Sequence, residues 1–227
     1  AEVLASVQIN SPHRTRAITK RTRVSMPTLL LIRHGETDWN RSGQVMGNQP
    51  IPLNQTGEQQ ARACAEMLAH TPIAGIVTSP VLRAVQTAHI VGRTHAAPVR
   101  HAPGLSEIGV GDWINRYWKD LGEDPAKRDW YAQPDRARPS GGETLREVQQ
   151  RAVAAVEEAL QVAQDGPYVF VSHGDVIRAL LAHSLQLDLH TLRQARIDHA
   201  GVSGIEVTDA ATHLLFLNHR PGLHRLA

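Results

Sequence analysis

The chain has 227 residues, of which 41% are hydrophobic, enough for one domain with its own core. Its sequence pI is near 9.0, but residues 1–27 hold five of the 24 basic and one of the 22 acidic residues, which leaves 19 basic and 21 acidic residues in the body. This balance argues against a nucleic-acid partner, and no apolar stretch approaches the roughly 20 residues of a membrane span.

The first 27 residues form a basic segment with no acidic residue after Glu2. Such a composition is typical of a disordered tail and also of a mitochondrial targeting segment. Met26 directly precedes the first predicted strand, so it is also a candidate translation start. We expect a disordered or extended basic tail at 1–27 and one domain at 28–227.

Cysteine usage bears on the compartment. Cys64 is the only cysteine, so the chain cannot form an internal disulfide. It lies within a helical pattern, which predicts a buried and unreactive thiol. A single unpaired cysteine is typical of a reducing compartment, and we therefore expect a cytoplasmic protein.

The first predicted element is a buried strand at Thr28–Ile32, which stops at Arg33, His34 and Gly35. Glycine permits a tight turn just where a cation and an imidazole leave the strand. In an open α/β sheet, ligands bind at the carboxyl ends of strands. This pattern suits a phosphate ester, because an arginine fork binds the oxygens while an imidazole attacks phosphorus.

Two helices and a strand follow. Thr56 and Gln59 are a candidate capping box for a helix that reaches about residue 69. A strand is predicted at Ala74–Thr78. Ser79 is then a candidate N-cap, with Pro80 at the first helical position, for a helix to about residue 91. Arg83 is expected in the first turn of that helix, where the helix dipole favours an anion.

The middle of the chain is less regular. Val99–His101 predicts a short edge strand before a loop that contains Glu107. Residues 109–142 hold most of the aromatic side chains and show only weak periodicity. They are either the core of a small cap or a lining for the non-phosphate end of a substrate. A strong helical period begins at Glu143.

The strand–His–Gly pattern then occurs a second time. Tyr168–Val171 predicts a strand that ends in Ser172, His173 and Gly174, followed by a helix to about residue 185. Two closing strands are predicted at Val202–Val207 and His213–Leu217, around an antiparallel turn at residues 209 and 210. Alternating strands and helices predict a three-layer α/β/α sandwich with a mostly parallel sheet and a small cap at about 109–142.

From about Thr28 to Leu217 the chain resembles the histidine phosphatase superfamily, also called phosphoglycerate mutase-like. Four motifs in the family's order carry the resemblance: Arg33-His34-Gly35-Glu36-Thr37, Ser79-Pro80 with Arg83 and Gln86-Thr87-Ala88, Leu105-Ser106-Glu107, and Ser172-His173-Gly174. The resemblance implies a phosphoglycerate mutase-like fold and phosphoryl-transfer chemistry.

The resemblance also implies roles for these residues. His34 would be the nucleophile that forms a phosphohistidine, with Gly35 as a candidate carbonyl partner for its ring. Arg33, Arg83 and His173 would bind the phosphoryl group, and Glu107 would be the proton donor. Two further phosphate-binding groups are implied, namely the Asn40 amide and the Gly174 backbone N–H.

Asp175 departs from the family pattern, which has a small neutral residue more often at this position. Its carboxylate would repel a strongly anionic substrate unless it points outward or pairs with Arg178. This departure puts the substrate, rather than the chemistry, in question.

The function expected from these features is a cofactor-independent phosphomonoesterase for small phosphorylated metabolites such as sugar phosphates or α-ribazole phosphate. The sequence shows no metal-binding motif, and we expect no metal, no nucleic acid and no membrane partner, with a homodimer as an option. One alternative is a 2,3-bisphosphoglycerate-dependent phosphoglycerate mutase, although residues 109–142 look short for it. Another is a non-catalytic protein that binds a phosphorylated ligand.

Overall fold

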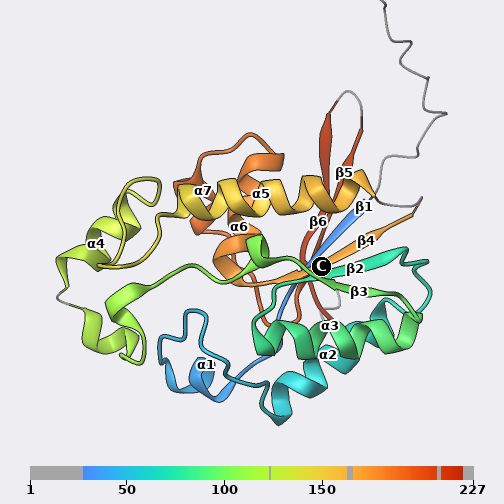
Figure 1. The fold of residues 1–227 in the computed structure, drawn as a ribbon, viewed down its shortest axis with the longest axis horizontal. Helices are drawn as coiled ribbons and strands as arrows, with labels where there is room; N and C mark the ends of the chain where they lie inside the picture. The colour runs from blue at the N-terminus through green and yellow to red at the C-terminus, as the bar shows by residue number, and fades with distance from the viewer. Residues whose placement is uncertain (1–27, 123, 163–165, 209–210, 222–227) are drawn as a thin grey trace, which may run out of the picture.

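The computed structural model describes residues 28–221, except 123, 163–165, 209 and 210. The tail expected at 1–27 and the turn expected at 209–210 lie outside these residues. In the described part, six strands form one sheet in the order β3-β2-β4-β1-β5-β6 (Figure 1). The strands are β1 (Thr28–Arg33), β2 (Gly75–Thr78), β3 (Val99–His101), β4 (Tyr168–Ser172), β5 (Val202–Val207) and β6 (Thr212–His219).

Helices cover both faces of this sheet. The α-helices are α1 (Asp38–Ser42), α2 (Gln55–Met67), α3 (Leu82–His95), α4 (Pro125–Ala132), α5 (Leu145–Gln161), α6 (Gly174–Ser184) and α7 (Leu189–Arg193). Short 3₁₀ helices occur at Pro103–Leu105, Gly111–Trp113 and Trp118–Leu121. Figure 1 shows α5 and α6 on one side of the sheet and α2 and α3 on the other. The predicted three-layer α/β/α sandwich is confirmed.

The sheet is mostly parallel, as predicted. Strands β3, β2, β4 and β1 pair in parallel, whereas β5 pairs antiparallel with β1, and β6 antiparallel with β5. In the central pair, Arg33 of β1 lies opposite Ser172 of β4. The residues that follow these two strands therefore emerge side by side at the same edge of the sheet.

Alternating side chains of the strands divide the core into two clusters. Leu29 and Leu31 of β1 belong to the cluster that also contains residues of α5 and α6. Leu30 and Ile32 belong to the cluster that contains residues of α2 and α3. Burial of each of these side chains contributes roughly 1.5–3 kcal/mol, so both faces anchor the strand that carries His34.

The predicted start of α2 is wrong. Its N-cap is Asn54, whose side chain accepts a hydrogen bond from the backbone N–H of Gly57 at 2.8 Å. The hydroxyl of Thr56 instead accepts from Nη2 of Arg41 at 3.1 Å. The hydroxyl oxygen that the sequence pattern assigned to the helix N-cap therefore accepts a tertiary hydrogen bond instead.

The predicted start of α3 is also wrong. The helix begins at Leu82 after the N-cap Val81, without a side-chain cap, and it extends to His95. The hydroxyl of Ser79 accepts hydrogen bonds from the backbone N–H of Val81 at 3.2 Å and from Nε2 of His173 at 2.8 Å. Arg83 nevertheless lies in the first turn, as predicted.

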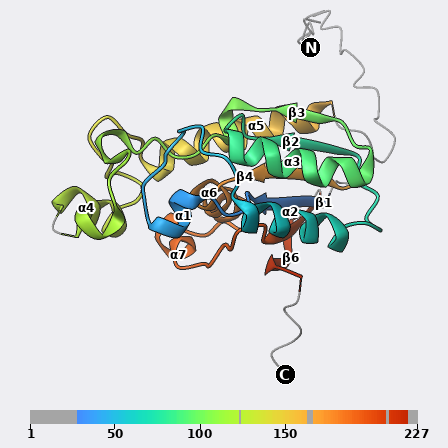
Figure 2. The same cartoon turned by 90° about the horizontal axis from the view of Figure 1, so that it is seen from below.

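The described residues between 109 and 142, which we call the cap, extend from one end of the sandwich in both views (Figures 1 and 2). Its helix α4 begins after the N-cap Asp124, with Pro125 at the start. Three tryptophans form its core: the Trp113 and Trp130 rings meet edge to face at 5.6 Å, and the Trp118 and Trp130 rings stack at 6.0 Å. The cap interior therefore combines this aromatic cluster with buried aliphatic side chains such as Leu121.

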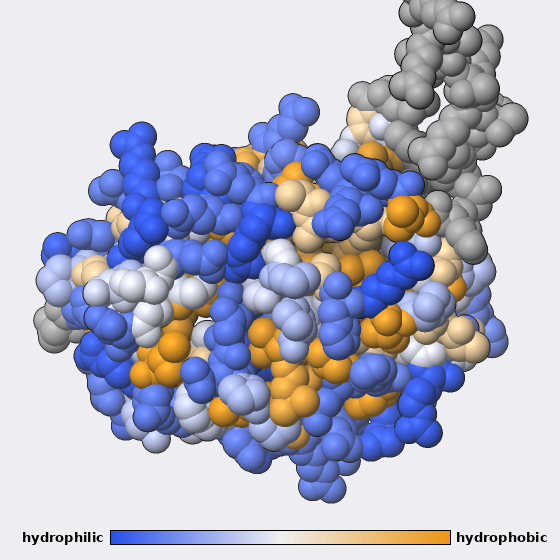
Figure 3. All heavy atoms as spheres, in the orientation of Figure 1, coloured by the Kyte–Doolittle hydropathy of each residue, from blue (hydrophilic) through white to orange (hydrophobic). Residues whose placement is uncertain are grey.

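The surface and the cysteine agree with the composition. Figure 3 shows a face that is mostly hydrophilic, with apolar side chains in separate patches. In the described residues, no helix combines the length and apolar composition that a membrane span requires. Cys64 is fully buried, and burial raises the pKa of its thiol to about 12, so the prediction of a buried thiol is confirmed.

Candidate active site

The two predicted histidines lie side by side. His34 follows β1 and His173 follows β4, and their ring centroids are 5.1 Å apart. The backbone N–H of His34 donates to the carbonyl of Ser172 at 3.0 Å, which ties the two strand ends together. Both rings are at least 99% buried. The repeated strand–His–Gly pattern therefore marks one site, as the sequence indicated.

Hydrogen bonds fix the protonation state of His34. Its Nδ1 lies 2.7 Å from the carbonyl of Gly35, which can only accept, so Nδ1 carries the proton. Nε2 in turn accepts a hydrogen bond from Nε of Arg83 at 3.1 Å. Burial, reinforced by the charge of Arg83, holds the pKa of His34 well below its usual range. The ring is therefore neutral, with the lone pair on Nε2.

Arg83 is a buried cation at the centre of the site. Its side chain has no exposed surface, and its Nη1 and Nη2 donate to the backbone carbonyls of Gln49 and Gly47 at 3.2 and 2.8 Å. Nη2 also lies 3.2 Å from Nδ1 of His173. Burial lowers the pKa of Arg83 to about 10, so the guanidinium stays charged at neutral pH.

The tautomer of His173 follows from its neighbours. A guanidinium can only donate, so Nδ1 of His173 accepts from Arg83. Nε2 then carries the proton and donates to the hydroxyl of Ser79 at 2.8 Å. Burial, followed by the charges of Arg83 and Arg33, keeps the pKa of His173 well below its usual range. Both ring nitrogens are engaged in this arrangement.

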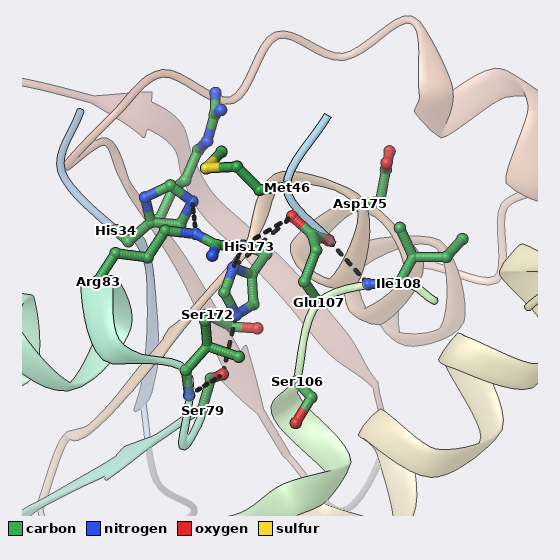
Figure 4. Close-up of polar contacts among 12 residues, drawn as sticks. His34, Met46, Ser79, Arg83, Ser106, Glu107, Ile108, Ser172, His173 and Asp175 are labelled. Carbon is green, nitrogen blue, oxygen red and sulfur yellow. Dashed lines mark hydrogen bonds and ion pairs between the residues drawn. The ribbon is translucent and has the colours of Figure 1, made fainter. Parts of the chain in front are cut away.

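Glu107 is the candidate acid. Its Oε2 lies 3.6 Å from Nδ1 of His173 and 3.8 Å from Nη2 of Arg83, and its Oε1 accepts from the N–H of Ile108 at 2.9 Å. Burial first, and the charge of Asp175 second, raise the pKa of Glu107. Figure 4 shows its carboxyl group turned toward His173 and Arg83. A carboxyl group in this setting can hold a proton closer to neutral pH.

The loop of Glu107 is held by a residue that the sequence analysis missed. Arg151 of α5 donates to the backbone carbonyls of Gly104, Ser106 and Glu107 at 2.7, 2.7 and 3.0 Å. The same guanidinium pairs with Glu143 at 2.8 Å. Nothing in the local sequence indicates this role, because Arg151 lies 44 positions from Glu107.

The other predicted phosphate ligands line a cavity of about 360 Å³ that reaches from this cluster to the cap. Arg33, Asn40, Gly174 and Glu107 all belong to its wall. Arg33 donates from Nη1 to the carbonyl of Ile197 at 2.7 Å, whereas its buried Nε has no hydrogen-bond partner in the described residues. Such an unpaired buried donor is suited to an anion.

Asn40 and Gly174 present amide groups to the same cavity. The Oδ1 of Asn40 accepts from the backbone N–H and the hydroxyl of Thr37 at 3.1 and 3.0 Å, as part of the capping box of α1. Gly174 is the first residue of α6, where N–H groups lack helical partners. A Cβ at Gly174 would lie 3.7 Å from Nε of Arg33 and 3.3 Å from Nη1 of Arg178, so glycine keeps this approach open.

Asp175 also lies in the cavity wall, and it pairs with Arg178. The Nη1 of Arg178 is 3.1 Å from Oδ1 of Asp175. This is one of the two arrangements under which the sequence analysis expected the carboxylate to be tolerated.

The cluster also contains residue types that bind metals. Ligand atoms of His34, Glu107 and His173 lie within 4.8 Å of one another. Arg83, however, donates to Nε2 of His34 and to Nδ1 of His173, so a cation already uses both imidazole lone pairs. A metal ion would have to displace this guanidinium and then tolerate its charge.

A neutral buried imidazole, two arginines and a half-buried acid, gathered beside the ends of parallel strands, are the groups that an enzyme needs to transfer phosphoryl groups. Residues 29–220 match the model of the histidine phosphatase superfamily (branch 1). The chain belongs to this superfamily and is an enzyme of its phosphatase class. The resemblance stated from the sequence motifs is thereby confirmed.

Individual relatives carry more than one name. The probable phosphoglycerate mutase GpmB of Yersinia enterocolitica is 31% identical, over 82% of this chain and 87% of the relative. The adenosylcobalamin/alpha-ribazole phosphatase of Salmonella typhimurium is 29% identical, over 85% and 96%. A solved structure, a mycobacterial glucosyl-3-phosphoglycerate phosphatase, has a TM-score of 0.78 and 28% identity and covers 85% of this chain and 98% of its own.

Proposed function

We propose that the chain hydrolyses phosphate monoesters of small metabolites in two steps, with the phosphoryl group carried on Nε2 of His34. One observation carries this proposal: the unprotonated Nε2 of His34 meets the guanidinium of Arg83 beside the carboxyl group of Glu107. A nucleophile, a charge clamp and a proton donor thus converge within the reach of one phosphoryl group.

In the first step, the lone pair on Nε2 of His34 attacks phosphorus while the bond from phosphorus to the ester oxygen breaks. Protonated Glu107 gives its proton to that oxygen, and the alcohol leaves. Arg83 and Arg33 compensate the charge on the remaining phosphoryl oxygens. The hydrogen bond from Nδ1 of His34 to Gly35 stabilises the charge that develops on the ring.

In the second step, the ionised Glu107 takes a proton from water while the water oxygen attacks phosphorus. The bond from phosphorus to Nε2 breaks, which regenerates neutral His34 and releases inorganic phosphate. The nucleophile, the acid and the cations all come from the chain, so the proposed cycle needs no metal or cofactor.

Phosphate binding requires Arg83 to turn away from both imidazoles, because its Nε otherwise occupies the Nε2 lone pair of His34 that attacks phosphorus. In the described arrangement Nδ1 of His173 accepts from Arg83, so it cannot also donate to a phosphate oxygen. We propose that Nη2 of Arg83 turns to the phosphate and that Nδ1 then takes up a proton from solvent, which makes the ring an imidazolium that donates to a phosphate oxygen. Asn40 and the N–H of Gly174 bind further phosphate oxygens from the cavity wall.

The relatives favour small phosphorylated metabolites as substrates, since those named as phosphatases act on α-ribazole phosphate and on glucosyl-3-phosphoglycerate. One relative named as a mutase keeps the bisphosphoglycerate-dependent mutase as the second candidate. A phosphatase releases inorganic phosphate from 3-phosphoglycerate or other esters, whereas a mutase isomerises 3-phosphoglycerate in the presence of 2,3-bisphosphoglycerate.

The decisive experiment is to trap the phosphoenzyme. Rapid mixing with a labelled phosphate monoester, followed by a quench in base, should give protein-bound phosphate that is stable in base and labile in acid. Steady-state assays should release p-nitrophenol and phosphate from p-nitrophenyl phosphate. Hydrolysis without a labelled intermediate would contradict the two-step route, and absence of any turnover would favour a non-catalytic binding protein.

Location and assembly stay proposals. A buried, unpaired thiol at Cys64 supports a reducing compartment such as the cytoplasm. Four apolar side chains of the edge strand β6 are exposed and support a homodimer through this edge of the sheet, which sedimentation of the purified protein would test. They are Leu214, Leu215, Phe216 and Leu217.

A further inference from the structure

The cavity extends well beyond the phosphate-binding residues. Its volume of about 360 Å³ falls in the range of roughly 300–1,000 Å³ that is typical of small-molecule sites. The rest of its wall consists of cap and neighbouring aromatic side chains, together with Arg178 and Arg193. The aromatic ones are Trp39, Trp118, Trp130 and Tyr131. The alcohol part of an ester would lie against this wall.

The two arginines Arg178 and Arg193 differ in their partners. Arg178 pairs with Asp175 at 3.1 Å and donates from Nε to the carbonyl of Ala195 at 2.8 Å. For Arg193, no carboxylate lies within 4.0 Å in the part of the chain that the structure describes. Its guanidinium carbon lies 3.8 Å from the ring centroid of Trp130 and 4.4 Å from that of Tyr131.

Arg193 is held firmly in this place. Its Nη1 donates to the backbone carbonyl of Trp130 at 2.9 Å, so one hydrogen bond and two ring faces fix the guanidinium. Burial lowers the pKa of Arg193, which reports a cation with reduced hydration. A partly buried cation without a carboxylate gains most from an anion that arrives with a ligand.

Among the described residues, Arg193 has no direct anionic partner in the cavity. Arg33, Arg83 and the proposed imidazolium of His173 face the phosphate group, and protonated Glu107 is neutral in the first step. Asp175 pairs with Arg178 and also raises the pKa of Arg193, but burial outweighs this effect, so the pKa of Arg193 is lowered. The charge of Arg193, beside the rings of Trp130 and Tyr131, therefore remains available to a ligand.

We propose that Arg193 is a specificity-determining residue that binds a second anionic group, a carboxylate or a second phosphate, on the alcohol part of the ester. This inference rests on the proposed phosphatase activity. It differs from the sequence expectation, in which Asp175 repels anionic substrates, because the pairing with Arg178 offsets that carboxylate.

Matched substrates give the direct test. 3-Phosphoglycerate and glycerol 3-phosphate differ only in a carboxylate against a hydroxymethyl group, and propane-1,3-diol bisphosphate and monophosphate differ only in a second phosphate. In at least one pair, wild-type enzyme should favour the ester that carries a second anionic group. The preference in kcat/KM should be roughly 10- to 100-fold, as expected for a charged hydrogen bond. The pair that shows the preference identifies the anionic group.

Variants assign that preference to Arg193. Arg193→Gln should bring the ratio of the two kcat/KM values to within about threefold of unity, by raising KM for the ester with the second anionic group. Its kcat/KM for p-nitrophenyl phosphate and for the esters without a second anionic group should stay within about twofold of wild type. Arg193→Lys should keep part of the ratio. The matched control is Arg196→Gln, because Arg196 is 80% exposed and pairs with Asp198 outside the cavity.

Two results would overturn the inference while leaving the phosphatase intact. One is a wild-type ratio near unity for both pairs. The other is an equal loss of Arg193→Gln on all esters together with a lower Tm, which would show that Arg193 only attaches the cap.

A binding experiment decides the matter even if no ester is hydrolysed. Calorimetric titration of the His34→Ala protein should show tighter binding of 3-phosphoglycerate than of glycerol 3-phosphate, or of the bisphosphate than of the monophosphate. The difference should disappear in the His34→Ala/Arg193→Gln double variant. Equal affinities in the single variant would reject Arg193 as an anion site, whatever the fate of the proposed activity.

Discussion

The Nε of Arg83 donates a hydrogen bond to Nε2 of His34 at 3.1 Å, so a cation points at the lone pair of the proposed nucleophile. This contact has two consequences. It opposes protonation of the ring, because a proton on Nε2 would face a positive charge. It also places the guanidinium beside the position that the phosphoryl group takes when Nε2 attacks phosphorus, so the same side chain can bind the phosphoryl oxygens after it releases the ring.

His34→Ala should abolish turnover and phosphoenzyme labelling, because it removes the atom that bonds to phosphorus. We expect kcat to fall by more than about a hundredfold, which corresponds to about 2.7 kcal/mol of barrier. The measurement is steady-state hydrolysis of p-nitrophenyl phosphate together with base-quenched labelling. His89→Ala is the control, since His89 is exposed on α3. A variant that keeps more than a hundredth of the rate would exclude His34 as nucleophile.

Much of the site could be predicted because its residues follow strands. His34 and His173 each come directly after an apolar run, and adjacent parallel strands bring such positions together. Arg83 was placed in a first helical turn from the local pattern alone. For these residues, sequence neighbours determine position, and the family resemblance adds the roles.

The contacts that could not be predicted join distant segments. Ser79 was expected to cap α3, but its hydroxyl accepts from His173, 94 positions away. Arg151 supports the Glu107 loop from α5, and Arg193 reaches the cap from the short helix α7, which the sequence pattern did not reveal. Polar side chains choose among competing partners, and only the folded chain shows which partners are near.

Activity should be unchanged by chelation. Arg83 uses both imidazole lone pairs of the cluster, so the proposed chemistry proceeds without a metal ion. Hydrolysis of p-nitrophenyl phosphate should stay within about twofold of the untreated rate after dialysis against EDTA. Vanadate and inorganic phosphate should inhibit competitively. Loss of activity that Mg²⁺ or Zn²⁺ restores would require a different mechanism.

Stability should fall as the solution becomes acidic, in part through His199. Burial, followed by the charge of Arg33, lowers the pKa of His199 to about 4, below the unfolded value of about 6.5. The unfolded chain therefore binds more protons as pH falls from about 6.5 toward 4, so this contribution is present above that window and lost within it.

The test compares unfolding free energies of wild type and His199→Asn at pH 7.5 and pH 5. The variant should lose less stability between the two values than wild type does. If the unfolding free energies of wild type and His199→Asn change equally with pH, His199 has the same pKa in the folded and unfolded chains.

Asp175 should adjust the pH range of catalysis through Glu107. Its charge is the second cause, after burial, of the raised pKa of Glu107, which must be protonated to help the alcohol leave. Asp175→Asn should lower that pKa and leave Arg178 unpaired, which acts in the same direction. The alkaline limb of kcat/KM for an alkyl phosphate should therefore move to lower pH. The control is Asp120→Asn, because Asp120 is exposed. If Asp175→Asn leaves the alkaline limb unmoved, a group other than Glu107 controls that limb.

Glu107→Gln tests the proton donor by means of the leaving group. An alkyl phosphate needs a proton on the ester oxygen as the bond breaks, whereas p-nitrophenolate leaves readily without one. Glutamine keeps the size of the side chain and can still accept from the N–H of Ile108, so the loop should stay in place. The phosphorylation step should fall further for the alkyl ester than for p-nitrophenyl phosphate, by an additional factor of roughly 10²–10⁴.

The measurement for Glu107→Gln is single-turnover formation of the phosphoenzyme, because Glu107 also activates water in the second step of the proposed cycle. Steady-state rates would mix the two roles. Equal losses on both esters would mean that Glu107 only positions the phosphate or balances Arg83, which lies 3.8 Å from its Oε2. The proton would then have another source, and Asp175 would be the first candidate, since it is the other carboxylate in the cavity wall.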